Sequence, residues 1–345
     1  MNVIDKTSNA TKDSFNLARK GKGVEEWSDR SYNICKGCEH GCLYCYARAQ
    51  RNRFDPTVRQ PGQWERQHLK ENSKLGKSIC SDKVVMFPST HDITPHFVNE
   101  AVTTVRNLIA GGNHVLIVSK PHLSVVRTLC RQLGAHKTPI MFRFTIGSLD
   151  ESLCAFWEPG APAPAERVEA LKHAFENGFR TSVSIEPMLG SVDTTIQLVQ
   201  HLESYVADTI WIGRMQRVPR KLNAHVEGFA AACKLMRSQQ TDAEVLRLVR
   251  RLQNHGKVRW KDSIKAVMAA ARRQNWPGTN PPPGELCTRI IGAKVTSESA
   301  QIPKPGGVSR LGEPGGFGRH LGSPLAHKFP VEGHVGNLAE SLVCG

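Results

Sequence analysis

Six short apolar stretches rich in β-branched residues recur along the chain, and polar or turn-forming residues separate each from the next. They lie at 31–35, 83–89, 114–120, 139–147, 180–187 and 208–214. Apolar runs of this length, bounded by turn signals, are typical of strands that are buried on both faces of a sheet. The pattern therefore predicts six strands.

The longer segments between these strands repeat apolar residues at intervals of three and four, as amphipathic helices do. They lie at 95–112, 122–135, 163–178 and 191–205. The first three close on glycine, which suits a helix C-terminus, and the third carries Pro164 in its first turn. Alternating strands and helices imply parallel strands that are joined by right-handed crossovers.

Six strand–helix units are too few for the closed eight-stranded barrel. The sequence therefore predicts an α/β fold, a partial open (β/α)6 barrel, over residues 28–214. In parallel α/β folds the active site lies at the carboxyl ends of the strands. Polar residues follow the predicted strands, and they are Ser89, Thr90, His91, Asp92, Lys120, Thr145, Glu186 and Arg214.

The flanking regions differ from the barrel in composition. Residues 1–27 form a polar N-terminal extension, and residues 215–276 are expected to form two or three basic helices. Residues 277–345 hold 13 Gly and 9 Pro and show no lasting helical or strand period. Such a composition predicts a disordered tail.

Charge favours a polyanionic partner, of which nucleic acid is the commonest. The chain has 46 Lys plus Arg against 31 Asp plus Glu, and residues 207–276 alone hold 15 against 5. A phosphate-contacting surface and a solvated helical face both explain this excess. The chain shows neither an apolar run of about 18 residues nor a signal-peptide pattern, so we expect a cytoplasmic protein without a membrane partner.

The stretch "NICKGCEHGCLYCYAR" (33–48) holds four cysteines, Cys35, Cys38, Cys42 and Cys45. Cytoplasmic thiols stay reduced, which favours metal or redox chemistry over disulfides. The last three, spaced Cys-x3-Cys-x2-Cys, can hold three irons of a [4Fe–4S] cluster and leave the fourth iron open to a small molecule. A structural zinc site usually takes two separated cysteine pairs, and no second Cys-x2-Cys follows. Cys35 could still complete a four-thiol site, so zinc or an all-cysteine cluster stays open.

"GCEHGCLYCYAR" resembles the cluster loop of the radical S-adenosylmethionine (SAM) enzymes, in which Cys-x3-Cys-x-aromatic-Cys binds the cluster; Tyr44 has the aromatic position. The wider context, with residues 158–171 and 184–189, is similar to the branch that includes spore photoproduct lyase. The resemblance implies that Cys38, Cys42 and Cys45 bind a [4Fe–4S] cluster. It also implies that the reduced cluster cleaves SAM to a 5′-deoxyadenosyl radical, which abstracts hydrogen from a substrate.

The resemblance also implies contacts to SAM at each strand end. Tyr44 would lie beside the adenine. The methionine amino group would meet Ser89, Thr90 or Asp92, and the methionine carboxylate would meet Lys120. Thr145 would lie near the ribose or the carboxylate of SAM, and Glu186 would accept a hydrogen bond from a ribose hydroxyl group or from the substrate. His40 is expected to be a hydrogen-bonding spacer rather than a metal ligand.

The loop after the second predicted strand departs from the spore lyase. It reads "FPSTHD" and lacks the hydrogen-donor cysteine of that enzyme, so a different substrate is expected, with nucleic acid as one candidate. A flavodoxin- or ferredoxin-type protein is the implied one-electron donor. The alternative is a non-catalytic zinc or iron–sulfur protein that binds nucleic acid, which would not cleave SAM.

Overall fold

A computed structural model describes residues 14–16, 23–77, 79, 81–216 and 218–273. The predicted tail at 277–345 and much of the N-terminal extension lie outside the described residues. None of the helices in the described part of the chain is long and apolar enough to cross a membrane.

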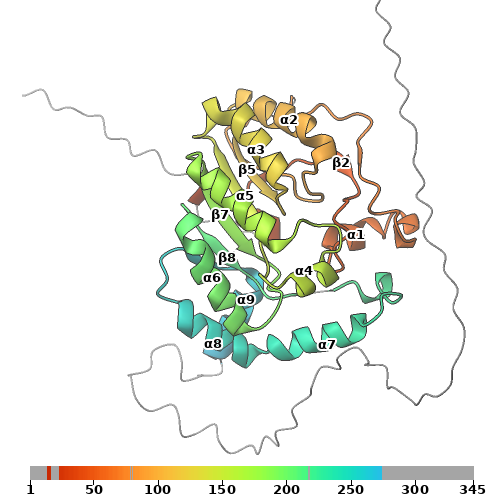
Figure 1. Ribbon diagram of the computed structural model, residues 1–345, viewed down its shortest axis with the longest axis vertical. Coiled ribbons are helices and arrows are strands. Elements are labelled where there is room, and N and C mark those ends of the chain that lie inside the picture. Colours follow the sequence, from red (N-terminus) through yellow and green to blue (C-terminus); the bar gives the residue numbers. More distant parts are fainter. Residues whose placement is uncertain (1–13, 17–22, 78, 80, 217, 274–345) are drawn as a thin grey trace, which may run out of the picture. The chain divides into compact units, whose positions relative to one another are not determined.

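A parallel sheet of seven strands forms the centre of the fold (Figure 1). In spatial order the strands are β1 (Arg30–Ser31), β4 (Val84–Phe87), β5 (His114–Ser119), β6 (Ile140–Thr145), β7 (Arg180–Ile185), β8 (Ile210–Ile212) and β9 (Val258–Trp260). Each strand pairs in parallel with its neighbour. Because β1 and β9 are not paired with each other among the described residues, the sheet does not close, and the predicted partial open barrel is confirmed.

Helices cover one face of this sheet. They include α2 (Val98–Ala110), α3 (Leu123–Leu133), α5 (Pro164–Glu176), α6 (Val192–Leu202) and α8 (Asp242–Leu252) (Figure 1). Alternate strand residues such as Phe87, Ile117 and Phe142 pack against the apolar stripes of these helices and form the largest core cluster. The alternation of side chains along each strand then sends the intervening residues to the other face.

The other face of the sheet is covered partly by the N-terminal segment. Val84, Met86, Leu116 and Met141 point to this face and cluster with residues of that segment, including Trp27. Burying Trp27 here removes a large apolar surface from water. Part of the predicted extension therefore belongs to the barrel core.

The strands differ from the sequence prediction in two places. The stretch 31–35 is split: β1 ends at Ser31, and β2 (Cys35–Lys36) pairs antiparallel with β3 (His68–Leu69). The seventh strand, β9, was not predicted, so the count of six is wrong by one. Its three residues lie in the basic stretch "GKVRWKDS", where they are too few to show a strand period.

The predicted C-terminal helices are present as α7 (Phe229–Gln239), α8 and α9 (Asp262–Arg273). Two short helices were missed, α1 (Tyr46–Arg51) after the cysteine loop and α4 (Glu151–Trp157) after β6. Each has at most two turns, which is too short for a periodic signal. Helix α1 directly follows the cysteine loop, and the last residue of α4, Trp157, accepts a hydrogen bond from that loop.

Candidate functional site

A cavity of about 420 Å³ lies at the carboxyl ends of the parallel strands. All ten site residues that the sequence predicted line this cavity: Cys38, Cys42, Tyr44, Cys45, Ser89, Thr90, Asp92, Lys120, Thr145 and Glu186. Residues from segments far apart in the chain therefore meet where parallel α/β folds carry their sites.

The cysteine loop runs from β2 to α1 and depends on a glycine at its start. Gly37 has φ +75°, and a Cβ there would lie 2.6 Å from the carbonyl oxygen of Trp64. The next residue, Cys38, donates its backbone N–H to that same oxygen at 2.9 Å. At the far end, Cys45 caps α1 because its sulfur accepts a hydrogen bond from the backbone N–H of Arg48. The loop is fixed at both ends.

The segment after α4 supports the middle of the loop. The backbone N–H of Gly160 donates to the carbonyl of His40 at 3.0 Å, and the N–H of Leu43 donates to the carbonyl of Trp157 at 2.9 Å. A Cβ on Gly160 would lie 2.3 Å from the carbonyl oxygen of Glu39. Only glycine allows this close approach of two backbones.

The Tyr44 side chain is anchored by a buried ion pair. Its phenol donates a hydrogen bond to Glu158, and the second carboxylate oxygen of Glu158 lies 2.5 Å from the guanidinium of Arg167 on α5. Burial, together with the negative Glu158, raises the pKa of Tyr44 well above its usual value. Tyr44 therefore stays a hydrogen-bond donor, and the loop is tied to the helical layer.

We expect Glu158→Gln to destabilise the protein by about 3–5 kcal/mol, because it leaves the buried Arg167 cation without its carboxylate. Thermal unfolding of the variant measures this loss. The matched control is Glu169→Gln, which neutralises an exposed carboxylate on the same helix as Arg167. Equal melting temperatures for the two variants would contradict a structural role for the ion pair.

Asp92 is the most connected polar residue of the cavity. One carboxylate oxygen accepts hydrogen bonds from the hydroxyl of Ser119 at 2.8 Å and from the backbone N–H of Lys120 at 2.7 Å. The other oxygen lies 2.9 Å from Nδ1 of His40, 3.4 Å from Nζ of Lys120 and 3.7 Å from the sulfur of Cys38. The carboxylate thus joins the cysteine loop to the ends of β4 and β5.

Asp92 and Lys120 hold each other in the charged state. Burial alone would raise the pKa of the Asp92 carboxyl, but Lys120 and His40 hold that pKa well below its usual range. Burial would likewise lower the pKa of Lys120, and the negative Asp92 raises it instead. A carboxylate and an ammonium group therefore face the cavity side by side, in an arrangement that can bind an amino-acid zwitterion.

His40 is completely buried, and both ring nitrogens have partners. Nδ1 lies 2.9 Å from Asp92, and Nε2 lies 3.1 Å from Nε2 of His122 at the start of α3. Possible metal-ligand atoms of Cys38, His40 and Asp92 all lie within 4.8 Å of one another. Because both nitrogens are already engaged, the arrangement favours the predicted role of His40 as a hydrogen-bonding spacer.

The remaining predicted residues are held at their strand ends. The side-chain oxygen of Asn33 accepts hydrogen bonds from the backbone N–H groups of Ser89 and Thr90, at 2.7 and 2.8 Å. Thr145 ends β6. Glu186 follows β7, and burial raises its pKa above the usual value. Asn33 is the first residue of the cysteine-rich stretch 33–48, and sequence reasoning assigned it no role.

Lys261, which sequence reasoning missed, adds a cation to the same cavity. It follows β9, is almost fully buried, and lies 2.6 Å from the carboxylate of Glu26 and 3.6 Å from that of Glu186. Its ammonium group also lies 4.1 Å from the ring centroid of Trp27 and donates to the carbonyl of Gly23 at 2.7 Å. Lys261 could not be recognised because strand β9 was not predicted, and a lysine within a basic stretch is not distinctive.

The donor set of the cavity fits a three-cysteine iron–sulfur cluster. Cys38, Cys42 and Cys45 line the cavity, whereas Cys35 lies on β2 in the main core and faces a different pocket. Burial raises the pKa of Cys42 to about 12 and also raises that of Cys38 and Cys45, so a bound cation would offset the cost of three thiolates. Three cysteine thiols, with no fourth cysteine among the described residues that line the cavity, suit a cluster with one open iron better than a closed structural zinc site.

Among known proteins, the family model described as the radical SAM superfamily matches residues 32–204. Uncharacterized protein ORF301 of Acidianus two-tailed virus is 26% identical over 205 residues, which are 56% of this chain and 67% of that protein.

Two of the solved structures that are similar to this chain are more distant. Spore photoproduct lyase complexed with dinucleoside spore photoproduct is 14% identical, with a TM-score of 0.44 over 66% of this chain and 74% of the other. Streptococcus suis SuiB bound to S-adenosylmethionine is 13% identical, with a TM-score of 0.38 over 59% and 44%. The family match, which spans half of the chain, therefore carries the identification. This protein is an enzyme of the radical SAM superfamily.

Proposed function

We propose that the protein holds a [4Fe–4S] cluster on Cys38, Cys42 and Cys45 and binds SAM in the same cavity. The observation that carries this proposal is that the three thiols share one cavity with the opposite charges of Asp92 and Lys120. A cluster held by these three thiolates would supply, once reduced, the electron for cleavage of SAM to methionine and a 5′-deoxyadenosyl radical, and that radical would take a hydrogen atom from the substrate.

The protein side chains bind and orient SAM in this proposal. Asp92 accepts a hydrogen bond from the α-amino group of SAM, and Lys120 donates one to the α-carboxylate. These contacts to opposite charges on the ligand replace part of the contact between Asp92 and Lys120. Tyr44, fixed by Glu158, forms the wall beside the adenine.

Four further side chains complete this binding site. Ser89 and Thr90 offer hydroxyl groups to the methionine end of SAM. Thr145 and Glu186 offer oxygen atoms to the ribose hydroxyl groups. The partly apolar walls of the cavity limit access of water to the reacting centre.

A one-electron donor of the flavodoxin or ferredoxin type is the partner that this chemistry requires. The excess of 15 Lys plus Arg over 5 Asp plus Glu in residues 207–276 supports nucleic acid as the substrate class.

Anaerobic reconstitution with iron and sulfide, followed by dithionite and SAM, tests the function. We expect one 5′-deoxyadenosine for each SAM consumed, measured by liquid chromatography. The control omits dithionite. A zinc-loaded protein without bound iron, or a fully loaded cluster that forms no 5′-deoxyadenosine with or without nucleic acid, would favour the non-catalytic alternative.

A further inference from the structure

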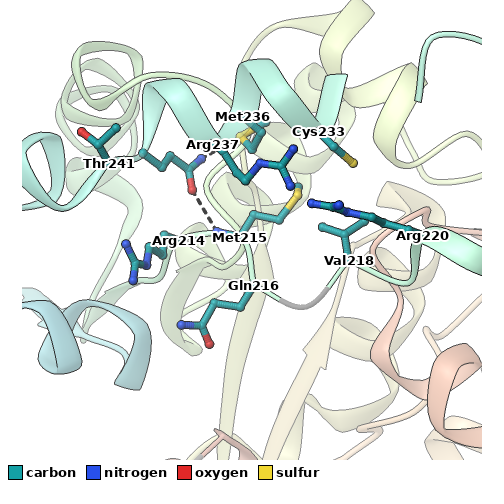
Figure 2. A pocket seen from close by; sticks show the side chains of 10 residues that line it. Arg214, Met215, Gln216, Val218, Arg220, Cys233, Met236, Arg237 and Thr241 are labelled. Carbon is teal, nitrogen blue, oxygen red and sulfur yellow. Dashed lines mark hydrogen bonds between the residues drawn. The ribbon is translucent and has the colours of Figure 1, made fainter. Parts of the chain in front are cut away.

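A second cavity, of about 650 Å³, lies beside the reactive one. It is formed by the chain after β8 and by α7 and the start of α8, and we call it the arginine groove. Its residues are Arg214, Met215, Gln216, Val218, Arg220, Cys233, Met236, Arg237, Gln240 and Thr241 (Figure 2). Three of these residues, Arg214, Met215 and Gln216, also line the cavity of the cysteine loop, so the two cavities adjoin.

Two guanidinium groups of the groove lack an acidic partner. The side chains of Arg220 and Arg237 converge beside Met215 (Figure 2). Both residues are exposed, and neither forms a side-chain ion pair or hydrogen bond within the described part of the chain. By contrast, Arg214 pairs with Asp242 at 2.6 Å. Two neighbouring cations with no carboxylate between them repel each other, and a bound anion would remove that repulsion.

The floor of the groove is apolar and fixed in place. Met215, Val218 and Met236 belong to one hydrophobic cluster. The buried Gln240 accepts a hydrogen bond from the backbone N–H of Met215 at 2.9 Å and donates to the carbonyl of Met188 at 2.9 Å. The apolar methionine floor can cover one face of a base while the basic rim binds its phosphate.

From these contacts we propose that the arginine groove binds a segment of single-stranded nucleic acid and leads the adjoining nucleotide into the reactive cavity. Arg220 and Arg237 bind backbone phosphates, and the methionine floor supports a base. Helix α7, which forms one side of the groove, carries Lys234 and Arg237 and no acidic residue, which favours a partner with regularly repeated phosphates over one with a single anionic group. This inference rests on the proposed function, because the groove adjoins the cavity that we assign to SAM.

Binding of a fluorescent oligonucleotide of about 12 nucleotides to the reconstituted protein with SAM tests the proposal. We expect the double variant R220Q/R237Q to bind about tenfold or more weakly at 0.1 M salt. Its slope of log affinity against log salt should fall by about 1–2, as expected for one or two lost phosphate contacts. DNA and RNA oligonucleotides are run in parallel to identify the type of strand.

The matched control is R250Q/R251Q, which removes the same charge from exposed arginines at the end of α8, outside the groove. We expect it to keep the wild-type affinity within about twofold. Equal weakening by both pairs, no binding by the wild type, or tighter binding of a phosphopeptide than of the oligonucleotide would each overturn the proposal. Circular dichroism and bound iron show that each variant is folded and loaded.

Wild-type formation of 5′-deoxyadenosine, measured in the same preparation, separates the two proposals. Formation without oligonucleotide binding would overturn the groove and leave the proposed function intact. Groove-dependent binding by a loaded protein that never cleaves SAM would overturn the proposed function and leave the groove intact.

Discussion

Replacing any one of Cys38, Cys42 and Cys45 by alanine is expected to abolish reductive cleavage of SAM and to deplete bound iron. Loss of a single outer-shell partner of a metal ligand commonly costs about 10- to 100-fold in metal affinity or activity, and loss of a ligand itself should cost more. Bound iron and the visible absorption of the cluster measure the loss of the cluster, and 5′-deoxyadenosine measures the loss of cleavage.

Cys35→Ala is the matched control for these variants. Cys35 is only seven residues from Cys42, yet it packs in the main hydrophobic core, away from the cavity of the other three thiols. We expect the variant to keep its iron and its activity. Loss of the cluster in Cys35→Ala, with retention in any of the other three, would refute the ligand assignment.

The second large effect is expected for Asp92→Asn. This change removes the negative charge that faces the buried ammonium group of Lys120 and should destabilise the fold by about 3–5 kcal/mol. It should also weaken SAM binding by about tenfold or more, because a hydrogen bond to a charged group is worth about 1.5–3 kcal/mol. Thermal unfolding measures the first effect, and equilibrium dialysis of labelled SAM against the reconstituted protein measures the second.

Two further variants separate stability from binding. Asp193→Asn, on α6, removes an exposed carboxylate that pairs with Arg247, and we expect little change in either measurement. The double variant D92N/K120M removes both charges of the buried pair, so much of the lost stability should return. SAM binding should stay weak. Wild-type affinity in the double variant would show that neither side chain contacts SAM.

Much of the barrel could be predicted because its strands are buried on both faces and read as continuous apolar runs. Strands β4 to β8 each fall within a predicted stretch. Strand β9 could not be predicted, because it consists of only Val258, Arg259 and Trp260, and three residues are too few to establish a strand period. It is recognisable only through its pairing with β8, which is a tertiary contact.

That the ten residues line one cavity could be predicted, because the strand ends meet in this architecture and the cysteine spacing marked the loop after the first strand. The partners of those residues could not. Tyr44 is joined to Glu158, 114 residues later, and Asp92 takes its position from His40 and from Lys120. Such pairings depend on the packing of helices against the sheet, about which local sequence says nothing.

The contact between Lys261 and the segment Gly23–Glu26 joins the two ends of the barrel, so it can form only late in the synthesis of the chain. Gly23 also donates its backbone N–H to Asp262, which is 239 residues further along the chain. At about 5–20 residues per second, a ribosome takes roughly 12–48 s to add that length. For most of this interval the nascent chain already holds the cysteine loop but lacks the last wall of its cavity. Completion of the pocket is therefore among the latest events in the folding of the barrel, and the thiols are made well before they can be fully enclosed.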